Sequence, residues 1–142
     1  PRTWRPFGVR LAGTVLGLGL IGICALTWIG FDAETRARFT PFQRLTLLVL
    51  GLLAFAAWFA LVRSRVVAEA ERLVVVNGYK RRDFAWPQVL AVHLPPGAPW
   101  VTLDLADGTT VSAMGIQGSD GSRARQAVRE LRTVLDAQTP SA

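Results

Sequence analysis

The sequence predicts a two-helix transmembrane hairpin followed by a small α+β domain, in which a strongly bent antiparallel sheet is capped by a C-terminal helix. Two long uncharged apolar runs occupy the first half of the 142-residue chain. The second half alternates short strand patterns with turn dipeptides and ends in one amphipathic stretch. We therefore expect the hairpin to cover residues 1–63 and the second domain to cover residues 64–142.

The first apolar run, Leu11 to Phe31, holds 21 consecutive uncharged residues, and the second, Leu45 to Val62, holds 18. At the rise of an α-helix the first run spans roughly 31 Å, which matches the hydrocarbon core of a bilayer. A signal peptide is disfavoured, because this run is too long and no small-residue cleavage site follows it. A buried helical pair in a soluble protein is the remaining alternative. The chain starts without Met, which indicates a trimmed or processed start.

The distribution of arginines predicts the orientation of the hairpin. Basic residues flanking membrane spans favour the cytoplasmic side. Six arginines lie before the first span or after the second: Arg2, Arg5, Arg10, Arg63, Arg65 and Arg72. The loop between the spans holds three: Arg36, Arg38 and Arg44. We expect a multi-pass protein of the plasma membrane with both termini in the cytoplasm.

Small residues mark the predicted helix contacts. Gly13, Gly17 and Gly22 lie in the first span and Gly51 in the second, and Gly13-x-x-x-Gly17 has the spacing that lets helices approach closely. These glycines favour packing between the two spans or, alternatively, docking against another membrane protein. Neither span contains an ionisable residue, which disfavours a transporter or channel.

The pattern of the second half predicts five or six short strands. Between Val101 and Ala113 the apolar alternation is continuous across the turn only if the loop has three residues, 106–108. Leu103 then pairs with Val111, and Gly108 takes a left-handed conformation. We expect a second hairpin around Asn77-Gly78, joining 72–76 to 79–85, and further strands at 66–69 and 89–94. Residues 113–118 are expected to connect the sheet to the helix.

The last element is predicted to be a helix over about 120–137. Its apolar residues recur at helical spacing: Ala124, Ala127, Val128, Leu131, Val134 and Leu135. Ser119 or Asp120 is expected to cap its start, and Pro140 lies beyond its end.

Four features carry a resemblance to a known family: two spans before the strands, the segment 80–89 (KRRDFAWPQV), the segment 103–108 (LDLADG) and a terminal helix. Together they resemble the actinobacterial membrane-anchored pleckstrin-homology-like (PH-like) proteins, the group that includes the low-molecular-weight antigen 6 type. The resemblance covers nearly the whole chain. It implies a PH-like fold, with Trp86 packed in the core at a one-turn corner, and a binding role. It carries over no catalytic residue.

The strongest functional pattern is the basic run Lys80, Arg81 and Arg82. On a strand, Lys80 and Arg82 share one face and Arg81 points the opposite way. With Arg63 and Arg65, these side chains are candidates for contact with anionic lipid, because the inner leaflet is negatively charged. A solvated edge strand is the alternative. Trp100, with Pro95 and Pro96 nearby, is a candidate for contact with a protein partner.

Catalytic chemistry has little support in the sequence. The chain has one His and one Cys, which excludes an intrachain disulfide and a Cys-based zinc cluster, and His93 has no nucleophile nearby in sequence. The glycine-rich stretch 115–121 lacks the Lys-Ser/Thr of a phosphate-binding loop. The net charge of +6 could suit nucleic acid, but the aromatic residues are not spaced for base stacking. We expect no catalytic residues, no metal, no cofactor, no nucleic acid and no identifiable small-molecule substrate.

The sequence thus predicts a non-catalytic, membrane-anchored PH-like binding module. Its expected role is that of an accessory or scaffolding subunit of a larger membrane protein assembly, with other membrane proteins as partners. The alternative function is that of a domain that binds anionic lipid head groups at the inner membrane surface.

Overall fold

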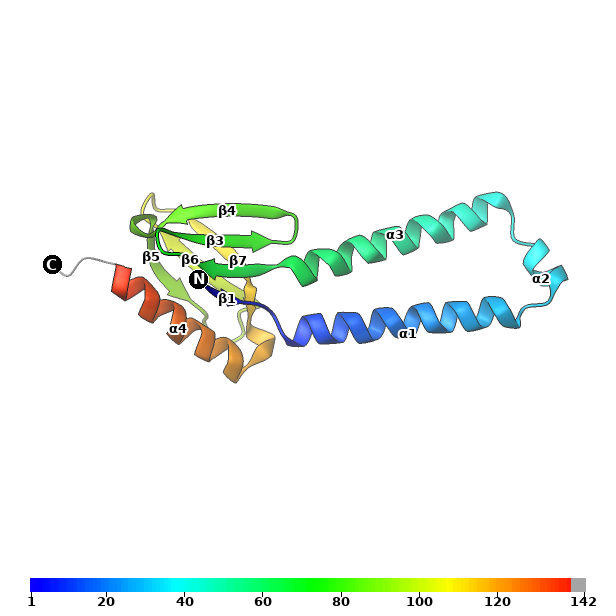
Figure 1. The fold of residues 1–142 in the computed structure, drawn as a ribbon, viewed down its shortest axis with the longest axis horizontal. Helices are drawn as coiled ribbons and strands as arrows, with labels where there is room; N and C mark the ends of the chain where they lie inside the picture. Colours follow the sequence, from blue (N-terminus) through cyan, green and yellow to red (C-terminus); the bar gives the residue numbers. More distant parts are fainter. Residues whose placement is uncertain (139–142) are drawn as a thin grey trace.

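The computed structural model describes residues 1–138, and it places a long helical hairpin beside a small sheet domain (Figure 1). Helix α1 (Gly8–Gly30) and helix α3 (Pro41–Arg63) run antiparallel and are joined through the short helix α2 (Ala33–Ala37). The predicted fold class is confirmed. Pro140 and the last residues of the predicted domain lie outside the described residues.

Both hairpin helices are 23 residues long, and their apolar windows have a mean hydropathy of 2.0 for α1 and 2.5 for α3. They are long and apolar enough to cross a membrane, and none of these window residues is buried. Each helix begins before the predicted apolar run. For α3 the reason is a capping box, in which Thr40 accepts from the N–H of Gln43 and the Gln43 side chain accepts from the N–H of Thr40.

The sheet domain contains seven strands within the described residues. They form two antiparallel sheets, one with the order β1-β2-β3-β4 and the other with the order β5-β6-β7. The strands are β1 (Arg2–Trp4), β2 (Arg65–Ala68), β3 (Arg72–Asn77), β4 (Lys80–Ala85), β5 (Val89–His93), β6 (Trp100–Leu105) and β7 (Thr110–Gln117). The buried residues of both sheets and of helix α4 (Ser122–Gln138) form one core, with Leu73, Leu103 and Leu131 fully buried.

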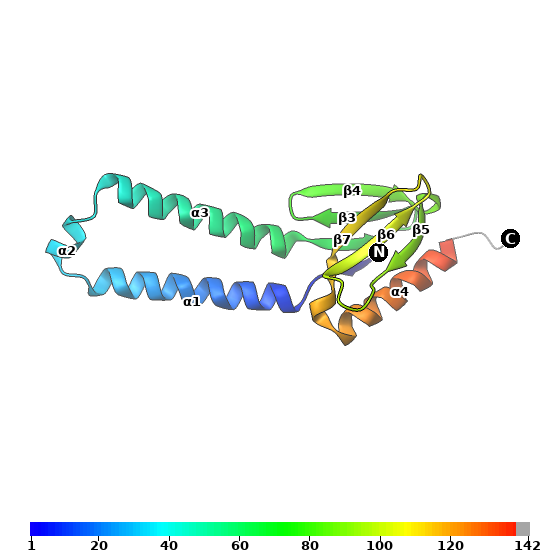
Figure 2. The same cartoon turned by 180° about the vertical axis from the view of Figure 1, so that it is seen from behind.

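Strand β1 is the main feature that the sequence reasoning missed. Arg2, Thr3 and Trp4 pair antiparallel with Ala68, Val67 and Val66 of β2. Trp4 is 7% exposed and belongs to the core. The helical hairpin is therefore an insertion between two neighbouring strands. Residues 2–4, which the sequence pattern assigns to the hairpin, belong to the sheet (Figures 1 and 2).

The two predicted β-hairpins are present. Val101 pairs with Ala113 and Leu103 with Val111, and Gly108 has φ +87°, as the three-residue loop requires. In the other hairpin Asn77 pairs with Lys80, so the loop is Gly78-Tyr79 and not Asn77-Gly78. Gly78, with φ +62°, occupies the first loop position, as in a type II′ turn.

The predicted connector after Ala113 is wrong, because β7 continues to Gln117 and is followed by a one-turn 3₁₀ helix, η2 (Gly118–Asp120). The extension crosses β2 closely, since a Cβ added to Gly115 would lie 2.6 Å from the carbonyl carbon of Arg65. Only glycine allows this approach. The Asn77 side chain joins the sheets by donating to Ser112 O at 2.6 Å and accepting from Met114 N–H at 2.8 Å.

Helix α4 buries the predicted apolar face, including Ala124, Val128, Leu131 and Leu135. It lies against the sheets on the side where β1 and β5 are found (Figures 1 and 2). The Trp86 corner is also confirmed. Trp86 is 4% exposed, begins the 3₁₀ turn η1 (Trp86–Gln88), and donates from Nε1 to Glu69 O at 3.0 Å.

Candidate functional site

The candidate site is the junction where the hairpin meets the sheet domain. The first contact there is made by Asp120. Its Oδ1 accepts from the N–H of Gly8 at 2.7 Å and its Oδ2 from the N–H of Phe7 at 2.9 Å. Helix α1 has no capping side chain of its own and no acidic residue in its first turn. Asp120, predicted as a cap for the C-terminal helix, therefore caps α1 instead.

The turn between β3 and β4 makes the second contact, against the end of α3. The Gly78 N–H donates to Ser64 Oγ at 2.9 Å, and the Tyr79 hydroxyl donates to Ala56 O at 2.6 Å. The guanidinium of Arg63 lies 5.7 Å from the ring centroid of Tyr79 and 5.9 Å from that of Phe59. Both ends of the hairpin are thus fixed to the domain by specific bonds.

The third contact ties β1 to α4. Trp4 Nε1 donates to Glu130 Oε2 at 2.9 Å, and Arg2 Nη2 lies 3.0 Å from Glu130 Oε1. The hydrogen bond from Trp4 is the main reason that the pKa of Glu130 is lowered, and the positive charge of Arg2 adds to it. The Glu130 carboxylate therefore holds β1 against α4.

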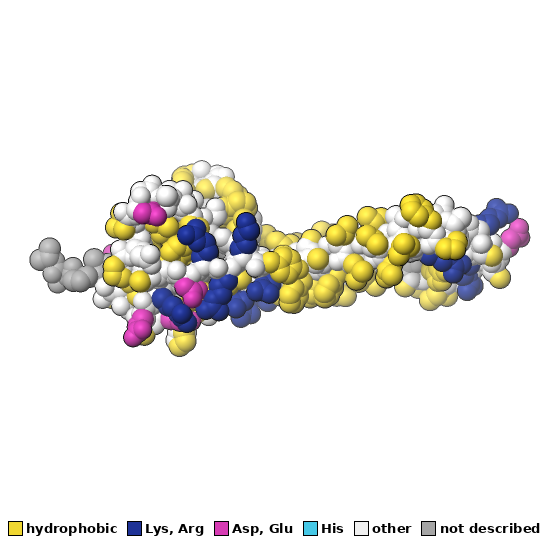
Figure 3. All heavy atoms as spheres, turned by 90° about the horizontal axis from the view of Figure 1, so that it is seen from above, with side chains coloured by type: hydrophobic (Ala, Val, Ile, Leu, Met, Phe, Trp, Pro, Cys, Tyr) yellow, Lys and Arg dark blue, Asp and Glu magenta, His cyan; other side chains and the backbone are white. Residues whose placement is uncertain are grey.

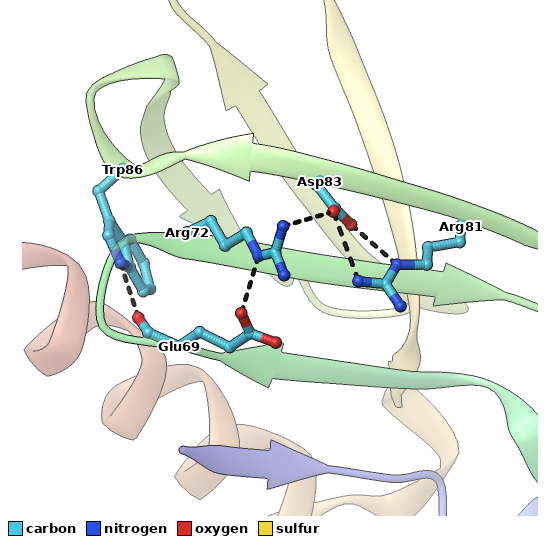
Figure 4. A network of polar contacts seen from close by, with 5 residues as sticks. All are labelled: Glu69, Arg72, Arg81, Asp83 and Trp86. Atoms are coloured by element: carbon cyan, nitrogen blue, oxygen red, sulfur yellow. Dashed lines mark hydrogen bonds and ion pairs between the residues drawn. The ribbon is translucent and has the colours of Figure 1, made fainter.

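The basic run on β4 is exposed, but its charges are not equally free. Arg81 Nε lies 3.0 Å from Asp83 Oδ1, and Asp83 Oδ2 lies 3.2 Å from Arg72 Nη1. Arg72 in turn lies 2.8 Å from Glu69, so two arginines and two carboxylates form one network (Figure 4). The hydrogen bond from Arg81 lowers the pKa of Asp83, and the hydrogen bond to Glu69 raises the pKa of Arg72.

This network leaves Lys80 and Arg82 as the cations of the strand that form no ion pair within residues 1–138. Arg82 is partly offset by Asp107: the hydrogen bond from Thr109 is the main reason that the pKa of Asp107 is lowered, and the positive charge of Arg82 adds to it. Lys80 and Arg82 share the face opposite Arg81, as strand alternation predicts. No salt bridge involves either of them in the part of the chain that the structure describes, and the Arg82 guanidinium lies 4.9 Å from the Phe84 ring centroid. Arg81 is a weaker candidate for binding an anion than the sequence indicated.

The other predicted site residues fall into two groups. Arg63 and Arg65 lie at the junction, where Arg65 Nη1 donates to Arg63 O at 3.0 Å. Trp100 lies in the other sheet, half-buried and paired with Gln117 just before η2. Lys and Arg side chains gather on the domain beside the hairpin and again at its far end, and hydrophobic side chains cover the length between them (Figure 3).

The glycines predicted to pack helices behave differently from one another. A Cβ at Gly13 would lie 3.7 Å from Trp58 and 3.8 Å from Leu61, so Gly13 packs α1 against α3. At Gly17, Gly22 and Gly51, no atom of another part of the described chain lies within 4 Å of such a Cβ. The helices lie closer at the domain end and diverge toward α2 (Figures 1 and 2).

Two hollows lie near the start of α1. One, of about 260 Å³, lies between β1, the end of β7 and α4, and Arg5, Asp120, Arg123 and Glu130 contribute its charged groups. The other, of about 320 Å³, lies between α1 and α3. Within residues 1–138, no group of three or more His, Cys, Asp or Glu side chains comes together, and His93 Nε2 lies 2.6 Å from Asp104 on the surface.

Two contributors to the junction, Trp4 and Asp120, were not identified from the sequence. One available signal was the start of α1, where no Ser, Thr, Asp or Asn directly precedes Gly8. An uncapped helix start requires a partner from elsewhere. The sequence does not indicate which residue supplies it.

A model of the bacterial PH domain family matches residues 63–133. The chain belongs to the bacterial PH domain family. The matched range starts at the end of α3 and therefore leaves out β1 and nearly all of the hairpin. Members of this family are generally non-catalytic, which agrees with a binding module.

Two similar proteins are uncharacterized proteins of Mycobacterium tuberculosis and Mycobacterium bovis. Each is 30% identical over 137 residues, which cover 96% of this chain and 87% of the relative. This similarity extends over the hairpin as well as the PH domain. No solved structure matches the chain.

Proposed function

We propose that this protein is a non-catalytic, membrane-anchored binding module that displays its PH domain at the inner face of the plasma membrane. In this proposal α1 and α3 cross the bilayer, both termini lie in the cytoplasm, and the protein serves as an accessory or scaffolding subunit of a larger membrane assembly. The resemblance to the low-molecular-weight antigen 6 type is part of the same proposal.

The observation that carries the proposal is the insertion of the hairpin between β1 and β2. A helix tethered at one flexible end would leave the domain free to rotate. Here Asp120 bonds to the start of α1 and the Gly78-Tyr79 turn bonds to the end of α3. Two crossings fixed to one domain would hold a defined surface toward the bilayer, which suits a scaffold.

The membrane placement can be tested by cysteine labelling in intact cells. After Cys24→Ser, single cysteines are placed at Thr35, within α2, and at Ser119, in the η2 turn of the PH domain. We expect a membrane-impermeant maleimide to label Thr35→Cys in intact cells and Ser119→Cys only after the cells are opened. Labelling of Ser119→Cys in intact cells would contradict the orientation.

The candidate surface for a partner helix is the part of α1 that α3 does not cover. Gly17 and Gly22 have open space where a Cβ would be, so the backbone of another helix could approach there. We expect Gly17→Leu to reduce recovery of a cross-linked partner from mild detergent. Gly30→Leu, at the end of the helix, is the matched control and should leave recovery unchanged. Equal recovery with both variants would count against this surface.

Binding of anionic lipid by the domain is the second candidate function, supported by Lys80 and Arg82, which lie beside the junction and form no ion pair among the described residues. Its test needs the full chain, because a fragment starting at Ser64 lacks Trp4 and β1. In nanodiscs, phosphatidylglycerol should slow hydrogen exchange in the 77–82 turn region. The double variant Lys80→Glu/Arg82→Glu should abolish this protection, and Arg81→Gln should change it less. If protection from hydrogen exchange is the same in the wild-type chain and in these variants, binding of anionic lipid by β4 is excluded.

A further inference from the structure

A groove of about 320 Å³ opens between α1 and α3 at the end of the hairpin nearest the domain. Most of its lining is apolar or aromatic, and one side chain is charged. The lining residues are Phe7, Arg10, Leu11, Thr14, Trp58 and Val62. The groove is lined from both helices, where they pack together at the end of the hairpin that adjoins the domain.

Arg10 is the charged residue of this groove, and its guanidinium has no hydrogen bond or ion pair to any other residue in the described range 1–138. Its Nε is buried and makes no hydrogen bond within residues 1–138, where Arg63 Nε is the other such side-chain atom. A buried donor without an acceptor is costly, so an acceptor from outside the chain is expected. Both unsatisfied nitrogens belong to the ends of the hairpin that adjoin the domain.

The electrostatics at this point favour an anion. Arg10 lies in the first turn of α1, where the helix dipole is positive and where a basic side chain is normally unfavourable. The carboxylate of Asp120 accepts from the N–H groups of Phe7 and Gly8, and it is the acidic side chain that bonds to the start of α1. On the far side of Phe7, Arg123 stacks 4.1 Å from the Phe7 ring centroid. Positive charge therefore exceeds negative charge around the groove.

The apolar part of the groove is held in shape by one bond across the helices. Trp58 Nε1 donates to Thr14 Oγ1 at 2.9 Å, and the Thr14 hydroxyl donates to Arg10 O at 2.8 Å. This arrangement satisfies the polar groups of Trp58 and Thr14 within the protein. The rest of the groove, which is Phe7, Leu11 and Val62, offers only hydrocarbon contact.

We propose that one anionic phospholipid of the inner leaflet occupies this groove, with its phosphate on Arg10 and an acyl chain along Leu11, Trp58 and Val62. The inference rests on the proposed membrane placement, which puts Arg10 at head-group depth, one residue before the uncharged run. A guanidinium binds phosphate through two parallel hydrogen bonds, and a rotation of the Arg10 side chain toward the bound phosphate would also give its Nε an acceptor. This site lies between the hairpin helices and is separate from the basic face of β4.

The test is retention of lipid by the full chain. The protein is reconstituted with equal amounts of phosphatidylglycerol and phosphatidylcholine, extracted in mild detergent, and examined by native mass spectrometry. We expect one phosphatidylglycerol to remain bound in preference to phosphatidylcholine. Arg10→Gln should lower this retention about tenfold or more, as loss of a charge-assisted pair does. Arg38→Gln, the same change beside α2, should leave it unchanged.

A second variant keeps the result independent of any folding defect in Arg10→Gln. Leu11→Trp fills the groove without removing a charge, and it should also displace the lipid. Equal retention of the two lipids by the wild-type chain, or full retention by both variants, would overturn the lipid site alone. Failure of the chain to co-float with vesicles would overturn the membrane placement and the lipid site together.

Discussion

Asp120 Oδ1 accepts a hydrogen bond from the N–H of Gly8 at 2.7 Å, although 112 residues separate the two in sequence. Gly8 has no Cβ, and a Cβ there would lie 2.9 Å from the same oxygen, so the glycine allows the close approach. The bond links the start of α1 to the turn before α4. The orientation of the hairpin relative to the PH domain therefore depends on a residue from the other end of the chain.

Replacing Asp120 by Ala should destabilise the protein by about 1 kcal/mol, because the cap of α1 is lost. The change also frees the hairpin from the domain at one of its two attachments. Urea unfolding in detergent micelles, followed by tryptophan fluorescence, measures the effect. Asp136→Ala removes an exposed carboxylate from α4 and is the control, with an expected change within about 0.5 kcal/mol. Equal effects would show that the cap contributes nothing specific.

Trp4→Ala should cost about 3–5 kcal/mol, as for other large aromatic side chains in a core. Trp4 is 7% exposed and closes the sheet edge beside β2, so its removal opens the core and frees β1. Limited proteolysis near residue 4 and urea unfolding should both detect the change. Thr3→Ala, on the exposed face of the same strand, should be nearly neutral. A small effect of Trp4→Ala would mean that β1 does not contribute to the domain.

Glu130→Gln should change how stability depends on pH. The pKa of Glu130 is lowered in the folded state, so the carboxylate contributes stability that is fully present above its unfolded value of about 4.5. That contribution is lost as the pH falls through the lower, folded pKa. The wild-type chain should therefore be more stable than Glu130→Gln near neutral pH, with the difference shrinking below about pH 4.5. A difference that stays constant from pH 7 to pH 3 would contradict this assignment.

Gly115→Ala should destabilise the domain by at least about 1–3 kcal/mol, because the added methyl group would overlap the backbone of Arg65 and Val66. Backbone atoms cannot rotate away as a flexible side chain can, so β7 and β2 would have to separate. Thermal unfolding followed by circular dichroism measures the loss. Gly30→Ala makes the same chemical change in open space, and it should be neutral or slightly stabilising. A neutral Gly115→Ala would show that the crossing of β7 and β2 is looser than described.

Local patterns were enough to predict much of the fold. The apolar runs of α1 and α3, the 103–111 register with Gly108, and the apolar face of α4 were all predicted from nearby residues. These features arise from local constraints: hydrophobic periodicity, the alternation of strand faces, and the freedom of glycine to adopt a positive φ. The candidate site was predicted less well. The sequence shows three cations on β4, and the structure shows that Asp83 offsets Arg81.

The amino-acid order already defined an apolar hairpin, a sheet and a closing helix, because each is encoded within a window of some ten to twenty residues. It did not reveal that Trp4 completes the sheet, that Asp120 caps α1, or that Arg10, with no partner among the described residues, lines one groove with Trp58. These relationships join segments separated by tens of residues, and many acidic or aromatic residues could have made them equally well. Folding selects among them by which pairings also bury the core, and that selection is expressed only in three dimensions.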